Sequence, residues 1–269
     1  EVKLQHKNIH FLEFEPISIL IFIVLNIFKL PKILITIHSI KPTLYNSFFK
    51  NILVYFQRVI FLIVIIILNF FNVKIVVHSK VHKKNLSFFF KKQIFIINYP
   101  CKKTSIKIKK KDKLDKILFF GLVRDDKGLL QFLNKVKLSN FKLSIFGKIN
   151  SYDLKFIKNL NHKNVFVKNS YIKESQIKKI FLSHDYLILP YTNNYSGSAG
   201  PMFLALSYGL PIICSKIEIF KSFLKSNKVG ILYDIKNFEK NLLKIDRKNH
   251  YFLQKKAYLY SKNNNWEHL

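Results

Sequence analysis

The sequence predicts an α/β protein of two domains, each a parallel β-sheet covered by helices. Short apolar runs rich in Ile, Val, Leu and Phe alternate with helical patterns along almost the whole chain, which is typical of strands buried on both faces of a sheet. The 269 residues are enough for one large or two ordinary domains. A lysine-rich stretch with few apolar residues, 101–116, breaks the alternation and predicts a linker. A charge run that binds phosphate is the alternative.

The first domain shows few clear elements. A mostly apolar helical pattern covers 45–71. The predicted strands cover 31–39, 73–79 and 92–100.

Two apolar runs in this domain, Ile17–Phe28 and Val59–Phe71, are shorter than the roughly 18 uninterrupted apolar residues of a membrane span. Both predict buried or interfacial helices. Contact of Val59–Phe71 with lipid is the alternative.

The second domain has the pattern of a complete doubly wound sheet, because six apolar runs alternate with helical patterns. Such sheets bind ligands at the carboxyl ends of their strands, in a crevice at the switch point of the strand order. The six predicted strands cover 116–123, 142–149, 164–172, 185–191, 210–215 and 229–234.

Composition limits the classes of partner. The net charge is +31. We favour AT-rich coding as its cause, and the alternative is that the charge serves to bind a polyanion or a membrane surface. The lysines are spread along the chain and Arg is scarce, which argues against nucleic acid. Cys101 and Cys214 form neither a metal spacing nor a disulfide framework, which fits a reducing cytoplasm. The opening EVKLQHKNIHF has no signal-peptide core and no Met, so we expect a fragment or a processed chain.

Two strand ends of the second domain carry groups that suit phosphate. Arg124 and Lys127 follow one strand at the start of a helix, where two cations and the positive helix end favour an anion. An ordinary surface pair is the alternative for these two residues.

The second strand end is the loop SGSAGP, Ser196–Pro201. Its glycines let the backbone approach a ligand, the N–H groups of Ser198 and Ala199 would face the crevice, and proline suits the first turn of the following helix. An ordinary βα loop is the alternative. Two such elements in one domain favour a diphosphate.

Several segments resemble one family. In order and spacing, ILFFGLVRDDKG, LSIFGK, DYLILPY…SGSAGPMFLALSYGLPIICS and VGILYD resemble the donor domain of GT-B retaining glycosyltransferases (glycosyl transferases group 1, family 4-like). ILITIHSIKPT, VKIVVHSKVHKKNL and NIHFLEFEP resemble strand ends of the family's first domain more loosely, and NNWEHL resembles the start of its last helix.

The resemblance implies the GT-B fold, in which two Rossmann-like doubly wound domains have parallel sheets that face each other across a cleft. It implies an acceptor-side domain at 1–101, a lysine-rich linker at 102–115, a donor domain at 116–250, and a C-terminal helix at 251–269 that returns toward the first domain.

The resemblance also implies the site residues. Arg124 and Lys127 match the basic pair that holds the donor diphosphate and stabilises the leaving group, and His38 matches a histidine near the transferred sugar. A structural role for His38 is the alternative, and His78 is interpreted as structural. The catalytic residues expected are His38, Arg124 and Lys127. The donor-binding residues expected are Gly121, Arg124, Lys127, Tyr171, Ile172, Ser196, Gly197, Ser198, Ala199 and Gly200, with Tyr171 and Ile172 lining the base pocket.

Two departures from the family pattern stand out. The positions of the family's two glutamates are Ser196 and Leu204 here, and neither is acidic, although a branch of the family shares this SG…A…G-x-P form. The first domain has three or four strands where the family has more, and it lacks the family's first strand and glycine-rich loop. We therefore expect a truncated or unusually small N-terminal domain.

The implied reaction moves a sugar from a nucleotide-diphosphate sugar to an acceptor with retention of anomeric configuration. The sequence has no Asp-x-Asp, and we expect neither a metal nor a cofactor. The acceptor expected is a glycan or a lipid-linked glycan, with peripheral membrane contact by the basic, apolar first domain. Envelope polysaccharide synthesis in the cytoplasm, at the inner face of the membrane, would fit.

Two rival functions were weighed. One is a GT-B-like nucleotide-binding or scaffold protein that lost the acidic pair and turns nothing over. The other, a dehydrogenase, is argued against because no G-x-G-x-x-G follows a strand.

Overall fold

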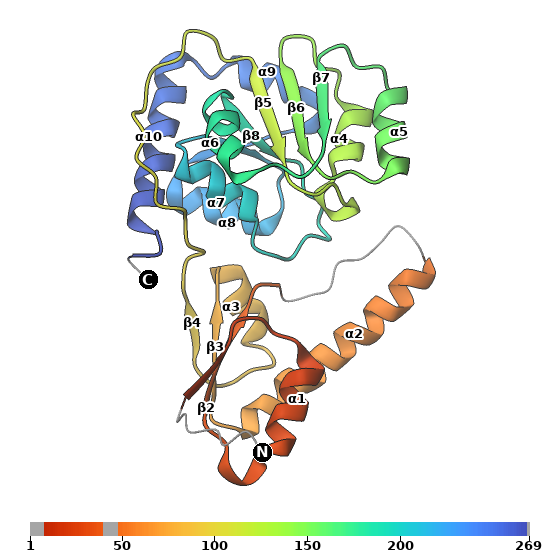
Figure 1. The fold of residues 1–269 in the computed structure, drawn as a ribbon, viewed down its shortest axis with the longest axis vertical. Coiled ribbons are helices and arrows are strands. Elements are labelled where there is room, and N and C mark those ends of the chain that lie inside the picture. Colours follow the sequence, from red (N-terminus) through yellow and green to blue (C-terminus); the bar gives the residue numbers. More distant parts are fainter. Residues whose placement is uncertain (1–7, 40–47, 268–269) are drawn as a thin grey trace. The chain divides into compact units, whose positions relative to one another are not determined.

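The computed structural model describes residues 8–39 and 48–267. The chain divides into two compact units (Figure 1). Unit 1 is Glu1–Tyr99 with Ser196–Ser198, and unit 2 is Pro100–Tyr195 with Ala199–Leu269. Every strand predicted from the sequence is present, with shorter ends.

Unit 1 has a four-stranded parallel sheet in the order β1-β2-β3-β4 within the described residues. Each crossover moves to the next neighbour in the same direction, so right-handed crossovers place the connecting helices on one face of the sheet. The strands are β1 (Asn8–Phe11), β2 (Lys32–Ile37), β3 (Val73–Val77) and β4 (Ile94–Ile96). The helices are α1 (Pro16–Leu25), η1 (Ile27–Lys29), α2 (Phe48–Ile67), η2 (Leu68–Phe70) and α3 (Lys80–Leu86).

The register of β2 and β3 builds the core of unit 1. Ile33 pairs with Val73 and Ile35 with Ile75, so their side chains share one face of the sheet. This face packs against the inner sides of α1 and α2. The buried helix residues in this core are Ile19, Ile23, Phe61, Val64, Ile65 and Leu68.

The helical pattern predicted over 45–71 corresponds to α2, which has 20 residues, and to the short helix η2 that follows it. The apolar run Val59–Phe71 begins eleven residues after the first residue of α2, Phe48. In the part of the chain that the structure describes, one helical stretch, Asn51–Phe70, is long and apolar enough to cross a membrane by length and composition. Such a helix is weak evidence on its own, because core helices pass the same test.

Unit 2 has a six-stranded parallel sheet in the order β10-β9-β8-β5-β6-β7. The order reverses between β7 and β8, which places the switch point between β5 and β8. The strands are β5 (Lys116–Phe120), β6 (Lys142–Gly147), β7 (Val165–Asn169), β8 (Tyr186–Leu189), β9 (Ile212–Cys214) and β10 (Gly230–Leu232).

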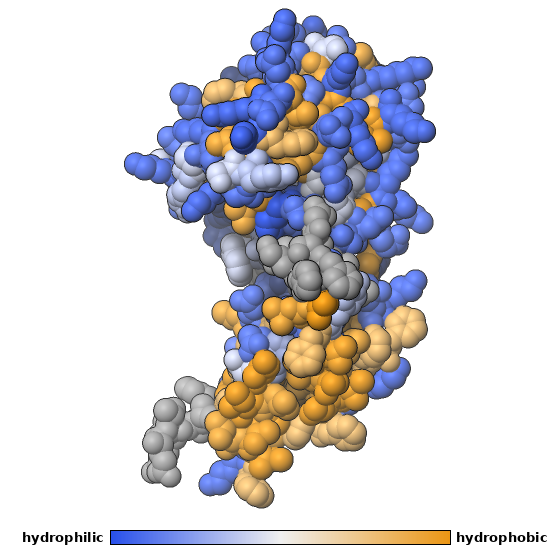
Figure 2. Space-filling model, turned by 90° about the vertical axis from the view of Figure 1, so that its right-hand side faces the viewer, coloured by the Kyte–Doolittle hydropathy of each residue, from blue (hydrophilic) through white to orange (hydrophobic). Residues whose placement is uncertain are grey.

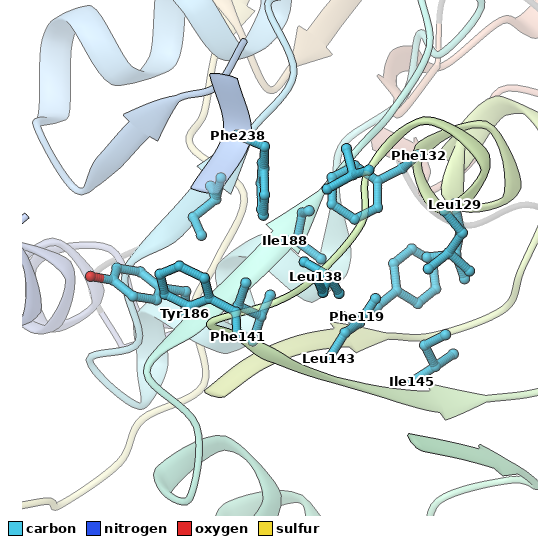
Figure 3. Packing of buried hydrophobic residues seen from close by; sticks show 14 of the residues in the cluster. Phe119, Leu129, Phe132, Leu138, Phe141, Leu143, Ile145, Tyr186, Ile188 and Phe238 are labelled. Carbon is cyan, nitrogen blue, oxygen red and sulfur yellow. The ribbon is translucent and has the colours of Figure 1, made fainter. Parts of the chain in front are cut away.

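Helices connect these strands and close the core of unit 2. Phe119, Phe132, Ile188 and Phe238 meet on one side of the sheet (Figure 3). The helices are η3 (Asp125–Lys127), α4 (Leu129–Lys135), α5 (Ser151–Asn159), α6 (Glu174–Leu182), α7 (Gly200–Ser207), α8 (Glu218–Asn227), η4 (Ile235–Asn237), α9 (Phe238–Leu243) and α10 (Arg247–Asn263). The last helix, α10, packs on α7 within unit 2.

The stretch predicted as a linker, 102–115, contains no helix or strand and groups with unit 2. Its end is held by the buried carboxylate of Asp185, which accepts hydrogen bonds from the backbone N–H groups of Asp115 (2.9 Å) and Lys116 (2.8 Å). Lys111 Nζ lies 2.9 Å from the same carboxylate. This end of the stretch is therefore tied to the start of β8.

Candidate functional site

The ends of β5 and β6 approach each other closely. Gly121 follows β5 with φ +109°, and Gly147 ends β6 with φ +150°. A methyl group on Gly147 would lie 2.0 Å from the carbonyl oxygen of Gly121, so only glycine fits there. This contact exposes the backbone of Gly121 at the carboxyl edge of the sheet.

The turn after β5 carries the predicted cations. Arg124 donates from Nε and Nη2 to both carboxylate oxygens of Asp126, at 3.1 and 2.9 Å. The Asp126 side chain is fully buried, while that of Arg124 is half exposed. The backbone N–H and hydroxyl of Thr192 donate to the Asp126 carbonyl, which ties this turn to the chain after β8.

Lys127 lies beneath this turn and is buried. The pKa of its ammonium is lowered to about 8, chiefly by burial and then by the Arg124 charge, while the Asp126 charge opposes the shift. A buried ammonium whose charged form is disfavoured gains when an anion arrives.

Lys127 and the start of α7 meet at Gly121. A methyl group on Gly121 would lie 3.4 Å from Lys127 Nζ and 3.5 Å from Pro201 Cγ. No side chain caps α7, and a methyl group on Gly200 would have no atom within 4 Å. The first turn of α7 therefore offers N–H groups and open space beside a buried ammonium, which is an arrangement that suits phosphate.

The other predicted donor residues are placed differently. Tyr171 and Ile172 follow β7, the edge strand, where the Tyr171 side chain is exposed and Ile172 is buried. Ser196–Ser198 group with unit 1. The structure thus brings Gly121, Arg124, Lys127, Ala199 and Gly200 to one place in unit 2, and Tyr171 and Ile172 follow the edge strand of the same sheet.

His38 follows β2 in unit 1 and is linked to His78. His38 Nδ1 lies 3.0 Å from His78 Nε2, and the two rings stack with centroids 4.8 Å apart. His38 Nε2 lies 2.9 Å from the Leu12 carbonyl, and His78 Nδ1 lies 2.8 Å from the Ile97 carbonyl. Burial lowers the pKa of His78.

These three bonds fix where the protons are. Both carbonyls can only accept, so His78 Nδ1 and His38 Nε2 each carry a proton. In the bond between the rings, neutral His78, the form that burial favours, accepts at Nε2.

We expect nitrogen NMR of the imidazoles to find His78 as the Nδ1–H tautomer. The reason is the bond to the Ile97 carbonyl, which can only accept and therefore needs a proton on His78 Nδ1. A His38→Ala variant should keep this tautomer, because the carbonyl remains. An Nε2–H tautomer of His78 in the unaltered chain would contradict the assignment.

Two contributors to these sites escaped the sequence interpretation. Asp126 is one of two aspartates in VRDDKG, and its position between Arg124 and Lys127 is the signal that marks it as their partner. His78 bonds to His38, which no sequence signal indicates. Among the residues that the structure describes, no cluster of three or more His, Cys, Asp or Glu side chains could hold a metal.

Solved structures share this fold at low sequence identity. Sucrose-phosphate synthase from Thermosynechococcus elongatus superposes with a TM-score of 0.77 at 15% identity, covering 98% of this chain and 71% of that one. A trehalose-6-phosphate protein from E. coli bound with UDP-2-fluoro glucose gives 0.66 at 9%, covering 96% and 70%. WaaG, a glycosyltransferase involved in lipopolysaccharide biosynthesis, gives 0.61 at 12%, covering 91% and 77%. The predicted GT-B fold is confirmed.

The sequence comparison identifies the family. No curated protein sequence matches the chain. The family model described as glycosyl transferases group 1 matches residues 102–250, which is more than half of the chain. The chain therefore belongs to the glycosyl transferases group 1 family.

Proposed function

We propose that this protein transfers a sugar from a nucleotide-diphosphate sugar to an acceptor hydroxyl, with retention of anomeric configuration. The observation that carries the proposal is the meeting of Lys127, Gly121 and the uncapped start of α7 at the switch edge of the sheet. A diphosphate there would meet an ammonium and backbone N–H groups together.

The barrier to such a transfer is charge separation, because the sugar becomes cationic while the diphosphate leaves as an anion. Lys127 and the helix start would stabilise the leaving diphosphate. Arg124 would add charge from the rim, with Asp126 holding its guanidinium in place. His38 of unit 1 is proposed to bind a hydroxyl of the sugar. No metal or cofactor has a role in this proposal.

The donor would come from the cytoplasm, where we propose that the protein works. The acceptor would be a glycan or a lipid-linked glycan of envelope polysaccharide synthesis. For a lipid-linked acceptor, the reaction would take place at the inner face of the membrane.

One observation favours a second candidate. Leu204 stands in α7 where the family has a glutamate, and its side chain cannot bind a hydroxyl. A nucleotide-binding protein without turnover would keep Lys127 and α7 and lose only this contact. Such a protein would bind the nucleotide and fail to transfer the sugar.

The first test is a thermal-shift panel with UDP, GDP, ADP and dTDP. A nucleotide at 100 times its dissociation constant should stabilise the protein by about 2.7 kcal/mol. The shift should disappear in Arg124→Ala/Lys127→Ala and persist in Lys155→Ala/Lys158→Ala, a control pair of exposed lysines on α5. No shift with any nucleotide would refute the proposed donor site. Binding without transfer would favour the second candidate.

Nucleotide affinity should depend on pH through Lys127. The free protein releases the Lys127 proton near pH 8, whereas a bound diphosphate holds that proton in place. Affinity should therefore be constant below pH 8 and fall by up to about tenfold per pH unit above it. Calorimetric titrations between pH 7 and 9.5 check this. If the Lys127→Arg variant still binds the nucleotide, its affinity should not change across this range. A flat profile in the unaltered chain would exclude Lys127 as a ligand of the diphosphate.

A further inference from the structure

The outward sides of α1 and α2 are apolar. Exposed side chains recur along both helices every three or four residues, opposite the sides that bury Ile23 and Ile65. We call this surface the outer helix face. It consists of Ile17, Ile21 and Val24 on α1, Ile52, Phe56, Val59, Ile63 and Ile66 on α2, and Phe28 and Phe70 in the short helices that follow them.

The other unit shows that coding bias does not explain this face. Helices α5 and α8 of unit 2 turn lysines outward, among them Lys155 and Lys225. In unit 1, exposed positions of α1 and α2 carry mostly isoleucine, valine, leucine and phenylalanine, whereas α3 turns Lys80, Lys83 and Lys84 outward. Figure 2 shows the apolar surface gathered on unit 1. A helix that is apolar on all sides requires a second apolar environment beyond its own core.

Helix α2 does not find its second apolar environment by crossing a membrane. Its inner side is packed on the sheet through Phe61, Val64 and Leu68. The strands before and after it, β2 and β3, pair directly over their length. A spanning α2 would draw this sheet into the bilayer, where the open edge of a sheet cannot be satisfied. Only the outer helix face is free to meet lipid.

Lysines and phenylalanines border the outer helix face at the edge of the sheet where the strands begin. Phe28 is 98% exposed and Phe70 is 82% exposed. The segment before β4 joins this edge, because Asn69 bonds to the backbone of Phe89 (2.8 Å) and Lys91 (2.7 Å). The exposed lysines of this edge are Lys29, Lys32, Lys91 and Lys92.

Carboxylates are absent from this edge. In 8–39 and 48–99, the described part of unit 1, the only acidic residues are Glu13 and Glu15, in the turn before α1. Exposed aromatic and aliphatic side chains beside lysines are the composition of surfaces that lie in the headgroup region of anionic membranes.

We propose that the outer helix face docks unit 1 flat on an anionic lipid bilayer, with Phe28 and Phe70 inserted and the four lysines at the headgroups. The docking extends the proposed location of the reaction by naming the surface that makes the contact. It rests on the proposed function only in the reason for docking, which is to reach an acceptor at the membrane.

A second copy of the chain is a poorer occupant of this face. Each chain carries a net charge of +31. Self-association would bring lysines together without carboxylates to pair them, whereas anionic lipid supplies the opposite charge.

The test is flotation of the full chain with vesicles of phosphatidylcholine alone or with 30% phosphatidylglycerol. We expect binding to the anionic vesicles. The variant Ile21→Ser/Phe56→Ser/Ile63→Ser should weaken binding at least tenfold, because buried apolar area drives insertion. The matched control, Phe166→Ser/Leu182→Ser/Leu259→Ser, removes exposed apolar side chains from unit 2 and should bind as the unaltered chain does. Circular dichroism confirms that each variant is folded.

A depth measurement uses fluorescence. The only tryptophan, Trp266, is exposed on unit 2 and should escape quenching by brominated lipids. In a Trp266→Phe background, Phe56→Trp should be quenched. Equal quenching at both positions, equal loss in both serine variants, or no binding to either vesicle would overturn the proposal. A dimer by light scattering that the outer-face variant dissociates would also overturn it.

These results are separate from those on the donor site. Vesicle binding needs no nucleotide, and the thermal shift needs no lipid. Failure of one leaves the other standing.

Discussion

Replacing Lys127 by Met is expected to lower the turnover number by about 10²–10³, the usual effect of removing one group that stabilises transition-state charge. Methionine keeps an unbranched, flexible side chain in the same space and removes the charge beside Gly121. The measurement is transfer from the nucleotide sugar that the thermal-shift panel selects. Arg124→Gln should cost less turnover, since two donors of its guanidinium are already bound to Asp126.

The same variant should leave the free protein as stable as before or more stable. The lowered pKa of Lys127 means that the folded state disfavours its proton. The unfolded chain therefore binds more protons than the folded one between about pH 8 and 10.5, and stability rises with pH across that window. Below it, the drop from 10.5 to about 8 corresponds to a cost of roughly 3 kcal/mol, at about 1.4 kcal/mol per pH unit. Lost turnover together with a lower Tm would mean that Lys127 supports the fold instead of the ligand.

Replacing Asp185 by Ala is expected to destabilise the protein by about 3–5 kcal/mol, because it leaves buried partners of a charge unpaired. The carboxylate accepts two backbone hydrogen bonds and pairs with Lys111. Its side chain is only 4% exposed, so water cannot replace it. At about 2–4 °C for each kcal/mol, the Tm should fall by roughly 6–20 °C.

The chain offers a matched control for Asp185. Asp234 pairs with Lys216 at 3.1 Å, and both side chains are about half exposed. Asp234→Ala should lower the Tm much less, because water can solvate Lys216 and the Lys236 N–H that the Asp234 carboxylate leaves. Asp185→Asn, which keeps one carbonyl oxygen for the backbone, should fall between the two. Similar losses in Asp185→Ala and Asp234→Ala would show that the buried carboxylate has no special role.

The fold was predictable because each strand is a short β-branched run and each crossover has a helical pattern. The ends were not, because DYLILPY continues as apolar residues beyond Leu189, where the ladder stops. The helix within 45–71 was predictable although Gln57 and Arg58 interrupt its apolar residues, because a polar pair at one turn leaves the helical spacing of the other residues unchanged.

The donor site was predictable only in part. Strand ends and glycines pointed to Lys127 and Gly200, since the carboxyl ends of parallel strands share one edge. The pairing of Arg124 with Asp126 depends on side-chain direction within one turn, and the bond between His38 and His78 joins residues forty apart in sequence. Neither has a periodicity that a sequence pattern could reveal.

The close approach of Gly121 and Gly147 bears on how this chain can change over time. Glycine codons are GC-rich, so the coding bias that we infer from the lysines and isoleucines works against them, and only seven glycines remain in 269 residues. Four of these have positive φ. Gly121 and Gly147 lie at the ends of β5 and β6, and Gly128 lies against the carbonyl of Pro190, just after β8. Under a coding bias that disfavours glycine, these three positions keep it because their backbone admits no substitute.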